Sequence, residues 1–345
     1  MRKSYKQLSN FLVMYHKSRK IKKVVSKAPH VSIGIPVFNG ENYLRQALDS
    51  ILSQTYTDFE LIISDNASTD KTQQICLKYA AKDERIRYHR NKENVGATEN
   101  FNHAFSLSSG EYFKWAAHDD VLAPDYLEKC VKVLDNDSSI VLCHSRTARI
   151  DENGVVIGNY DDRTLYRISS WKQHERFGDL ISQTNSCWAI MGVMRADALK
   201  KTPLHGSYLD ADRNLLAELG LIGRMYEIPE HLFFRRDHPQ AYTTTYHSKD
   251  VLVRDYQNQM AWWKGNKKRS LIILPRWKNI FEYFRSVNRV PLKFSERLLC
   301  YQEIGRWLLY GDGWGMMRCD LNNMYALWRI NLIAPKQKDT DKKTN

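Results

Sequence analysis

Two adjacent carboxylates, Asp119 and Asp120, stand at the end of a short apolar run in residues 113–123, FKWAAHDDVLA. Neighbouring carboxylates repel each other unless a cation or hydrogen-bond donors offset their charge, so the pair suggests a metal or polyol site. Acid pairs also cap helices, and a helix-like run begins soon afterwards at Pro124. The residue types leave both interpretations open, so the position of the pair in the fold has to decide between them.

The apolar pattern around this pair alternates between strand and helix. Strand-like runs occur at residues 31–37, 59–64, 86–89, 111–116 and 140–149. Helical spacing occurs between them at residues 44–52, 72–81 and 126–134. Such alternation predicts an α/β fold with a mostly parallel sheet flanked by helices, and ligands of such sheets bind at the carboxyl ends of the strands. We therefore expect the ends of the first, second and fourth strands to place their polar residues on one rim.

The expected rim is rich in side chains that suit a base edge and a ribose. They belong to Asn39, Glu41, Asp65 and Asn66. The sequence has neither a GxGxxG nor a GxxxxGK[ST] phosphate loop, so a phosphate ligand would need a metal. Mg²⁺ and Mn²⁺ prefer carboxylate oxygens, and the acid pair could hold either ion. A plain turn, with Ser68 or Thr69 capping the next helix, is a second interpretation of residues 65–70, and both roles can hold together.

Composition excludes several classes of protein. The chain has 345 residues, of which 43% are hydrophobic, and can bury a substantial core. Its six cysteines show neither CxxC spacing nor clustering with histidine, which disfavours a zinc module or a disulfide framework and fits a reducing cytosol. No apolar run approaches the ~20 residues that cross a bilayer. We therefore expect a cytoplasmic protein.

The net charge of +13 is distributed unevenly along the chain. Residues 1–40 carry nine Lys or Arg and no acid, and residues 263–300 carry ten against two acids, which leaves the body mildly acidic. Basic flanks favour contact with an anionic surface, such as the inner face of a membrane, while an acidic body disfavours nucleic-acid binding. Solvated tails are the alternative interpretation of these flanks.

The order of motifs resembles the nucleotide-sugar-binding half of a family 2 glycosyltransferase of the GT-A fold, over about residues 31–240. Two stretches carry the resemblance: VSIGIPVFNGENYLRQALDSILSQTYTDFELIISDNASTDKT at residues 31–72 and ENVGATENFNHAFSLSSGEYFKWAAHDD at residues 93–120. The resemblance implies that the nucleoside is lined by Pro36, Phe38, Asn39 and Glu41, and that uracil is held by Asp65 and Asn66. It also implies that Asp119 binds ribose and Asp120 binds metal-diphosphate, with the site braced by Asn94, Gly96 and Asn102.

Two positions depart from the pattern of this family. Asn66 stands where many relatives carry a second aspartate, which makes a preference for uridine less secure although its carbonyl can still accept a base N–H. Ala117 stands where many relatives carry a further aspartate. The expected metal site is therefore leaner than the common form of the family.

Downstream residues supply the expected base and further charged groups. Residues 187–195 read as a buried strand, and residues 208–219 as a helix with acids at its start. The resemblance implies that Asp212 is the general base, with Asp210 as the second candidate; helix capping is the alternative, and it is favoured for Asp210.

Arg235–His238 resembles the family's Arg-x-His ending and follows a strand-like run at residues 228–234. Arg236 is therefore a candidate for stabilising the diphosphate, and His238 for binding the metal. An ordinary surface loop is the alternative interpretation of these residues.

The expected organisation is a basic arm at residues 1–28, a GT-A domain at 29–245, aromatic and basic helices at 246–333, and a tail at 334–345. Helices rich in Trp, Tyr, Lys and Arg can lie in a bilayer interface, where a lipid-linked acceptor would be found, or pack their aromatic residues on the body. The sequence leaves both interpretations open.

The residues and the resemblance together predict an inverting glycosyltransferase. It would move a sugar from a nucleoside-diphosphate sugar, with UDP expected, to a saccharide or lipid-linked acceptor in cell-surface polysaccharide or glycoconjugate synthesis. The expected cofactor is Mn²⁺ or Mg²⁺. A nucleotidyltransferase-like enzyme is one alternative, although it would want a glycine- and lysine-rich phosphate loop near the first strand. A non-catalytic nucleic-acid binder is another, and the acidic body disfavours it.

Overall fold

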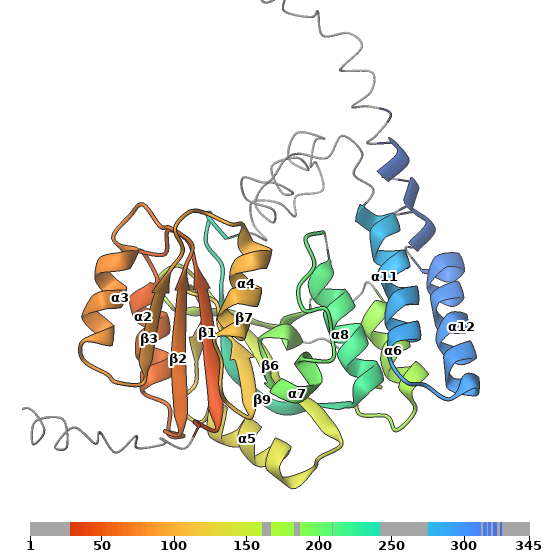
Figure 1. The fold of residues 1–345 in the computed structure, drawn as a ribbon, viewed down its shortest axis with the longest axis horizontal. Coiled ribbons are helices and arrows are strands. Elements are labelled where there is room, and N and C mark those ends of the chain that lie inside the picture. The colour runs from red at the N-terminus through yellow and green to blue at the C-terminus, as the bar shows by residue number, and fades with distance from the viewer. Residues whose placement is uncertain are drawn as a thin grey trace, which may run out of the picture.

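The computed structural model describes residues 28–160, 167–182, 187–208, 210–241 and 275–311, together with short pieces between residues 313 and 325. The tail and all but the last residue of the basic arm lie outside this part of the chain, as do Trp262, Trp263 and Trp328 from the aromatic helices. The described residues contain a central sheet with helices on both faces, and two further helices at one end (Figure 1).

The central sheet has nine strands in the described residues. Their order is β3-β2-β1-β4-β8-β6-β9-β5, with β7 paired to β6. The strands are β1 Val31–Val37, β2 Phe59–Asp65, β3 Ile86–Arg90, β4 Tyr112–Trp115, β5 Val121–Leu122, β6 Ile140–Ile150, β7 Val156–Tyr160, β8 Val193–Arg195 and β9 Arg224–Arg236. Strands β1 and β2 are buried along their whole length, which explains their continuous apolar runs.

The sheet is parallel in its first half and mixed in its second. Strands β3, β2, β1 and β4 run parallel to one another. Strand β8 is antiparallel to both β4 and β6, β9 is parallel to β6, and β5 is antiparallel to β9. The connection from β4 to β5 is too short for the crossover that a parallel pair needs. The expectation of a mostly parallel sheet therefore describes only the half that contains the first four strands.

Helices cover the sheet and extend it at one end. They are α2 Leu44–Leu52, α3 Thr72–Ala80, α4 Ala97–Ser106, α5 Tyr126–Asn136, α6 Gln173–Ile181, α7 Ala196–Leu199, α8 Ala211–Ile222, α11 Pro275–Arg289 and α12 Phe294–Tyr310. Figure 1 shows α11 and α12 beside α6 and α8, at the far end from α2 and α3. One hydrophobic cluster joins buried residues of α11 and α12, such as Tyr283 and Ile304, to Phe177 of α6 and Leu215 of α8. The two C-terminal helices thus share a core with the body.

Residues 187–195 do not form the single strand expected from their apolar run. A short 3-10 helix, η1 Trp188–Met191, precedes the three-residue strand β8. Cys187 has φ 61°, and a Cβ on Gly192 would lie 2.7 Å from the Cys143 carbonyl oxygen, so the backbone turns and packs closely here. An apolar run reports burial and does not distinguish a buried turn from a strand. None of the helices in the described residues is long and apolar enough to cross a membrane.

Candidate functional site

Two loops meet at the carboxyl edge of the parallel half of the sheet. Asn39, which follows β1, donates its backbone N–H to Ser68 Oγ at 2.9 Å and accepts the Thr69 N–H on its side-chain oxygen at 2.8 Å. Glu41 donates its N–H to Asp70 Oδ2 at 3.0 Å. Asn39 has φ 52°, a conformation that asparagine tolerates better than most residues. The loops after β1 and β2 therefore form one interlocked unit.

This unit presents an aromatic face. Pro36 lies opposite Ser64 in the β1–β2 ladder, and the side chain of Phe38 just beyond the strand is 41% exposed. A Cβ on Gly40 would lie 2.8 Å from the ring of His118, so only glycine lets the first loop approach the turn after β4 this closely. The ends of β1, β2 and β4 are thus brought together, as the βαβ pattern predicted.

Asp65 and Asn66 are buried and already bonded. The Asp65 carboxylate accepts the Ser68 N–H at 2.8 Å, the Tyr88 hydroxyl at 2.6 Å and Arg90 at 2.7 Å. The capping role expected of Ser68 or Thr69 falls instead to Asp70, whose Oδ1 accepts the Thr72 N–H at 2.9 Å at the start of α3.

The Asn66 amide shows the same saturation. Its side chain donates to Asn94 Oδ1 and to the Gly96 carbonyl, and it accepts from Asn91 and from the Val95 N–H. An amide side chain has two N–H donors and two acceptor lone pairs, so its capacity is filled. Contact between the Asn66 side chain and a uracil, which the resemblance implies and which stays a prediction, would have to replace one of these bonds.

The three residues expected to brace the site lie at a helix that links two parts of the chain. Asn94 accepts both from Asn66 and from the Gly96 N–H at 2.9 Å, and Gly96 has φ 89° at the start of α4. Asn102 of α4 exchanges two hydrogen bonds with the backbone of His205, at 3.0 and 3.1 Å. Helix α4 therefore connects the loop after β2 to the segment that precedes α8.

The acid pair is tied to the end of β9 and does not cap a helix. Helix α5 begins at Tyr126, and β5 lies between it and the pair. Asp120 Oδ1 accepts the backbone N–H of Arg236 at 2.9 Å, and Asp119 Oδ2 lies 3.0 Å from His238 Nε2. The pairing of β5 with β9 produces this contact between residues far apart in sequence.

Arg236 holds the contact between the acid pair and the end of β9, which we call the clasp: Asp119 with His238, and Asp120 with the Arg236 backbone. It is 1% exposed, and its guanidinium donates to the Asp119, Asp151 and Glu152 carbonyls and to Gln46. Four of its N–H groups are therefore used by the protein itself. Its expected contact with a diphosphate stays a prediction, and the observed geometry gives it a positioning role.

The neighbouring Arg235 interacts electrostatically with both acids of the pair. Burial and the adjacent Asp119 charge raise the pKa of Asp120. Burial opposes the ionisation of Asp119, but His118 and the bonded His238 lower its pKa overall. The buried Lys114 of β4 also interacts with Asp120, and burial lowers the pKa of this lysine to about 8. Asp119 is therefore the carboxylate that the protein keeps ionised.

The donor set at the acid pair fits a metal that is completed by substrate oxygens. Asp119 Oδ2 and His238 Nε2 lie 3.0 Å apart and form a hydrogen bond, which an ion bound to both atoms would replace. The second nitrogen of His238 is buried without a hydrogen-bond partner. No group of three or more His, Cys, Asp or Glu side chains in the described residues could hold a metal by itself. The residues present thus fit an ion that phosphate oxygens help to bind.

The expected base and its alternative both lie at the start of α8. Asp210 occupies the N-cap position with φ 55°, yet its side chain makes no capping bond and lies 3.5 Å from Asn279 Nδ2 of α11. Asp212 accepts the Arg213 N–H at 2.8 Å. Burial, and next the Asp210 charge, raise the pKa of Asp212. A raised carboxyl pKa makes a stronger base, which is what deprotonation of a hydroxyl requires.

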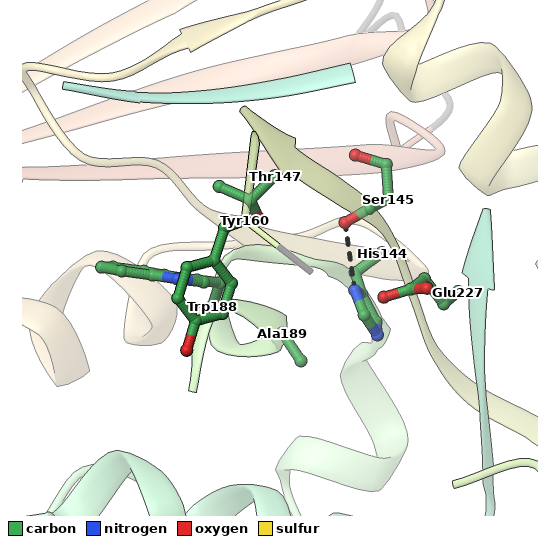
Figure 2. Close-up of a pocket in the computed structure, with 7 residues that line it drawn as sticks. All are labelled: His144, Ser145, Thr147, Tyr160, Trp188, Ala189 and Glu227. Atoms are coloured by element: carbon green, nitrogen blue, oxygen red, sulfur yellow. Dashed lines mark hydrogen bonds between the residues drawn. The ribbon is translucent and has the colours of Figure 1, made fainter. Parts of the chain in front are cut away.

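A small pocket is lined by residues of β6, β7, η1 and β9. Figure 2 shows Tyr160 and Trp188 on one side of it, and His144 beside Glu227 on the other. The Arg235 guanidinium lies 4.8 Å from the Trp188 ring centroid, and Tyr160 meets the same ring edge-on at 6.2 Å. Since Arg213 of α8 interacts with Cys187, next to Trp188, η1 connects the acid pair to the predicted base.

Several side chains of this site were not predicted from the sequence. Tyr43 places its ring 4.6 Å from His238 and 4.9 Å from the Arg236 guanidinium, Gln46 binds Arg236, and Arg90 binds Asp65. Arg90 follows the third strand-like run, so its position at a strand end was a usable signal. Tyr43 and Gln46 lie in a helical pattern that gives no hint of their partners.

Comparison with known proteins gives a family for residues 32–202. Residues 32–202 match the family described as Glycosyl transferase family 2. An uncharacterised glycosyltransferase of Rickettsia typhi is 44% identical over 119 residues, which are 34% of this chain and 36% of that protein. Chondroitin synthase of Escherichia coli is 36% identical over 153 residues, 44% of this chain and 22% of the synthase. The chain thus spans about a third or less of the length of these two relatives.

A solved structure gives the same fold. Residues 1–349 of TarS from S. aureus, in complex with UDP, superimpose with a TM-score of 0.56 at 14% sequence identity, covering 82% of this chain and 72% of that one. The expectation of a GT-A fold with a C-terminal helical part is thereby confirmed.

Proposed function

We propose that this chain, which carries a family 2 glycosyltransferase domain over residues 32–202, transfers a sugar from a nucleoside-diphosphate sugar to a hydroxyl group with inversion of the anomeric carbon. One observation carries the proposal. The clasp of Asp119 with His238, and of Asp120 with Arg236, stands on the same sheet edge as the interlocked loops after β1 and β2. This arrangement supports a metal-diphosphate site beside a nucleoside site.

The proposed donor is a UDP-sugar. Phe38 is exposed beside the loops and offers a face for the base, while Asn39 and Glu41 lie on the same unit. The similarity to TarS in complex with UDP supports uridine at this place. The hydrogen-bonding groups of Asp65 and Asn66 are occupied by the protein, so these residues hold the loops in shape. We therefore assign most base recognition to the loop backbone and to Phe38.

Diphosphate binding is assigned to Asp119, Asp120 and His238. Asp119, Asp120 and His238 would hold a Mn²⁺ or Mg²⁺ ion together with oxygens of the diphosphate. When bound, this ion supplies positive charge to the departing diphosphate. Arg235, coupled to both acids, adds a guanidinium at the same place. Arg236 keeps the β9 end in position through its backbone contacts.

The chemical step is a single displacement with Asp212 as the base. Asp212 takes the proton from the acceptor hydroxyl, and the acceptor oxygen forms a bond to the anomeric carbon. The bond from that carbon to the diphosphate oxygen breaks, and the nucleoside diphosphate leaves with the electron pair. Attack from the face opposite the leaving group inverts the anomeric configuration. Asp210 keeps the pKa of Asp212 raised and remains the second candidate for the base.

The transferred sugar is assigned to the surface beside Trp188, since the pocket itself has room for little more than a water molecule. An aromatic ring beside polar groups such as Thr147 and Glu227 suits a sugar, which has both C–H faces and hydroxyls. Trp188 connects this place to the acid pair, because the Arg235 guanidinium lies 4.8 Å from its ring centroid and interacts electrostatically with both acids.

The proposed acceptor is a saccharide or a lipid-linked saccharide in the synthesis of cell-surface polysaccharide or glycoconjugate. The matching segment of chondroitin synthase supports polysaccharide chemistry. We place the reaction in the cytoplasm, at the inner face of the membrane. A nucleotidyltransferase is not supported, since the family match covers the segment on which it would depend. A non-catalytic nucleic-acid binder is not supported either, because the matched family is one of enzymes.

The experiment is calorimetric titration of UDP with and without Mn²⁺, joined to an assay of UDP release from a panel of UDP-sugars. Wild-type protein should bind UDP more tightly with Mn²⁺, and Asp120→Ala should lose this increment. Asp197→Asn, whose side chain is 86% exposed on α7, is the control and should keep it. Equal wild-type affinity with and without Mn²⁺ would remove the metal role, and absence of both UDP binding and UDP release would refute the function.

A further inference from the structure

Helices α11 and α12 have one face that packs on the catalytic body. Tyr283 meets Phe177 of α6 at 6.1 Å and Trp307 of α12 at 5.6 Å, both edge-on. Ser286 of α11 donates to the buried Glu218 of α8 at 2.7 Å. This inner face accounts for the aromatic residues that pack on the body.

The outer face of the same helices exposes large apolar side chains. Phe294, Leu298 and Leu309 of α12 are 75%, 50% and 77% exposed. At 3.6 residues per turn they lie within about 60° of one another around the helix. Phe281 of α11 is 59% exposed as well, and Phe284 contacts Tyr301 across the two helices at 5.6 Å. The two helices thus present a joint apolar surface, which marks an interaction site on a soluble domain.

Acidic and basic side chains around this outer face differ in their exposure to solvent. The carboxylates of Glu282, Glu303 and Asp320 are buried, and Glu296 is partly covered and pairs with His174 at 2.9 Å. All exposed charged side chains described between residues 275 and 325 are basic: Arg285, Arg289, Lys293, Arg306 and Arg318. Three of them, Arg285, Arg289 and Arg306, also form ion pairs with Glu282, Glu218 and Glu303. A partner for this surface therefore has an apolar interior and negative groups at its boundary.

We propose that the outer face of α11 and α12 binds the surface of an anionic lipid bilayer. Exposed Phe and Leu would enter the boundary between headgroups and acyl chains. The exposed Arg and Lys side chains, of which Lys293 stands next to Phe294, would contact the anionic headgroups. The proposal rests on the proposed function, because it supplies a reason for a lipid-linked acceptor.

Binding of α11 and α12 would also bring α8, which carries the predicted base Asp212, to the membrane. Asn279 of α11 accepts the Asn214 side-chain N–H of α8 at 3.2 Å, and its own amide lies beside Asp210. Together with the bond from Ser286 to Glu218, these contacts fix α8 to the helix whose outer face meets the lipid. The predicted base Asp212 is therefore held at a set distance from the bilayer surface.

The test is flotation of the full chain with vesicles of phosphatidylcholine, with and without phosphatidylglycerol. Wild-type protein should float with the anionic vesicles and much less with neutral ones, and salt should weaken binding. The variant Phe294→Ser/Leu298→Ser/Leu309→Ser should bind at least about tenfold more weakly. Leu77→Ser, at a side chain that is 52% exposed on the distant α3, is the matched control and should bind as wild type.

Two results would overturn the proposal. One is a triple variant that floats like wild type, which would assign any binding to other parts of the chain. The other is a wild-type dimer in light scattering that the triple variant converts to a monomer with unchanged flotation, which would assign the surface to a second copy. UDP release from UDP-sugar without vesicles is measured in parallel. It should be unchanged in the triple variant, and it separates failure of the docking surface from failure of the proposed function.

Discussion

The sheet end built from β1, β2 and β3 and the region of α8 and α11 differ in how completely their buried polar groups are hydrogen-bonded. In the described residues up to Cys143, every buried side-chain nitrogen or oxygen has a hydrogen-bond partner, as the filled amide of Asn66 illustrates. Beyond that point such atoms without a partner recur, among them Asn214 Oδ1, Tyr283 Oη and Trp277 Nε1 at the contact of α8 with α11. An unmade buried hydrogen bond costs about 1–3 kcal/mol.

This difference suggests that the two regions contribute to different steps of the proposed reaction. The nucleoside end, which is the part of the sheet formed by β1, β2 and β3 where we propose that the nucleoside binds, has its buried polar groups hydrogen-bonded without a ligand. Donor binding there should therefore need little reorganisation. The α8–α11 contact leaves buried polar atoms unpaired beside the predicted base, and local departures from full pairing are expected at functional sites. Changes at the first end should therefore affect folding and donor binding, and changes at the second should affect turnover.

The largest expected effect is that of Asp212→Asn. An amide of the same shape cannot take a proton, so turnover should fall by about 10²–10⁴. UDP affinity should stay at the wild-type value, because the nucleoside end is untouched. Steady-state UDP-sugar turnover and calorimetric titration of UDP measure the two quantities.

Asp197→Asn on α7 is the matched control for this substitution and should keep both quantities. Retained turnover in Asp212→Asn together with its loss in Asp210→Asn would transfer the role of base to Asp210. A large loss of UDP affinity in Asp212→Asn would instead break the division between the two ends.

A pair of Tyr→Phe substitutions tests the comparison directly. The Tyr88 hydroxyl donates to the buried Asp65 carboxylate at 2.6 Å, so Tyr88→Phe should lower the free energy of unfolding by about 1–2 kcal/mol. The Tyr283 hydroxyl is buried without a partner, so Tyr283→Phe should leave that free energy unchanged or raise it. Urea unfolding followed by fluorescence measures both, and equal destabilisation by the two changes would contradict the comparison.

The nucleoside end is also the part of the fold that the sequence predicted best. Residues 31–37 and 59–64 were expected as buried strands, and β1 and β2 occupy them with at most one residue of difference. Continuous apolar runs, short βα turns and parallel pairing all carry local signals there. The same signals placed Asp65 and the acid pair on one edge of the sheet.

The other end depends on contacts that local patterns do not encode. The run at residues 187–195 was wrongly assigned to one strand, because burial alone does not separate η1 from β8. The Asp119–His238 contact arises from the pairing of β5 with β9, more than a hundred residues apart in sequence. Residue type made Arg236 a candidate for phosphate binding, whereas its burial beneath the acid pair is visible only in three dimensions.

A smaller effect is expected from Asn279 of α11, which contacts the start of α8. Asn279→Ala removes the acceptor of the Asn214 amide and the neighbour of Asp210, so the start of α8 should be held less firmly. Turnover should fall by about threefold to tenfold, the effect of about 1 kcal/mol, with UDP affinity unchanged. Asn288→Ala, on the outer face of the same helix, is the matched control and should turn over normally. Equal losses in both variants would point to general disturbance of α11.

The finest test concerns the pH dependence of turnover. The Asp210 charge is the second cause, after burial, that raises the pKa of Asp212. The base works only when ionised, so turnover should fall as the pH falls through this raised pKa. Asp210→Asn removes the like charge and keeps a residue that tolerates the φ of 55° at this position. The acid limb of the pH profile should therefore move to lower pH in Asp210→Asn and stay in place in Asp197→Asn. An acid limb that does not move, or that moves to higher pH, would mean that Asp212 does not govern it.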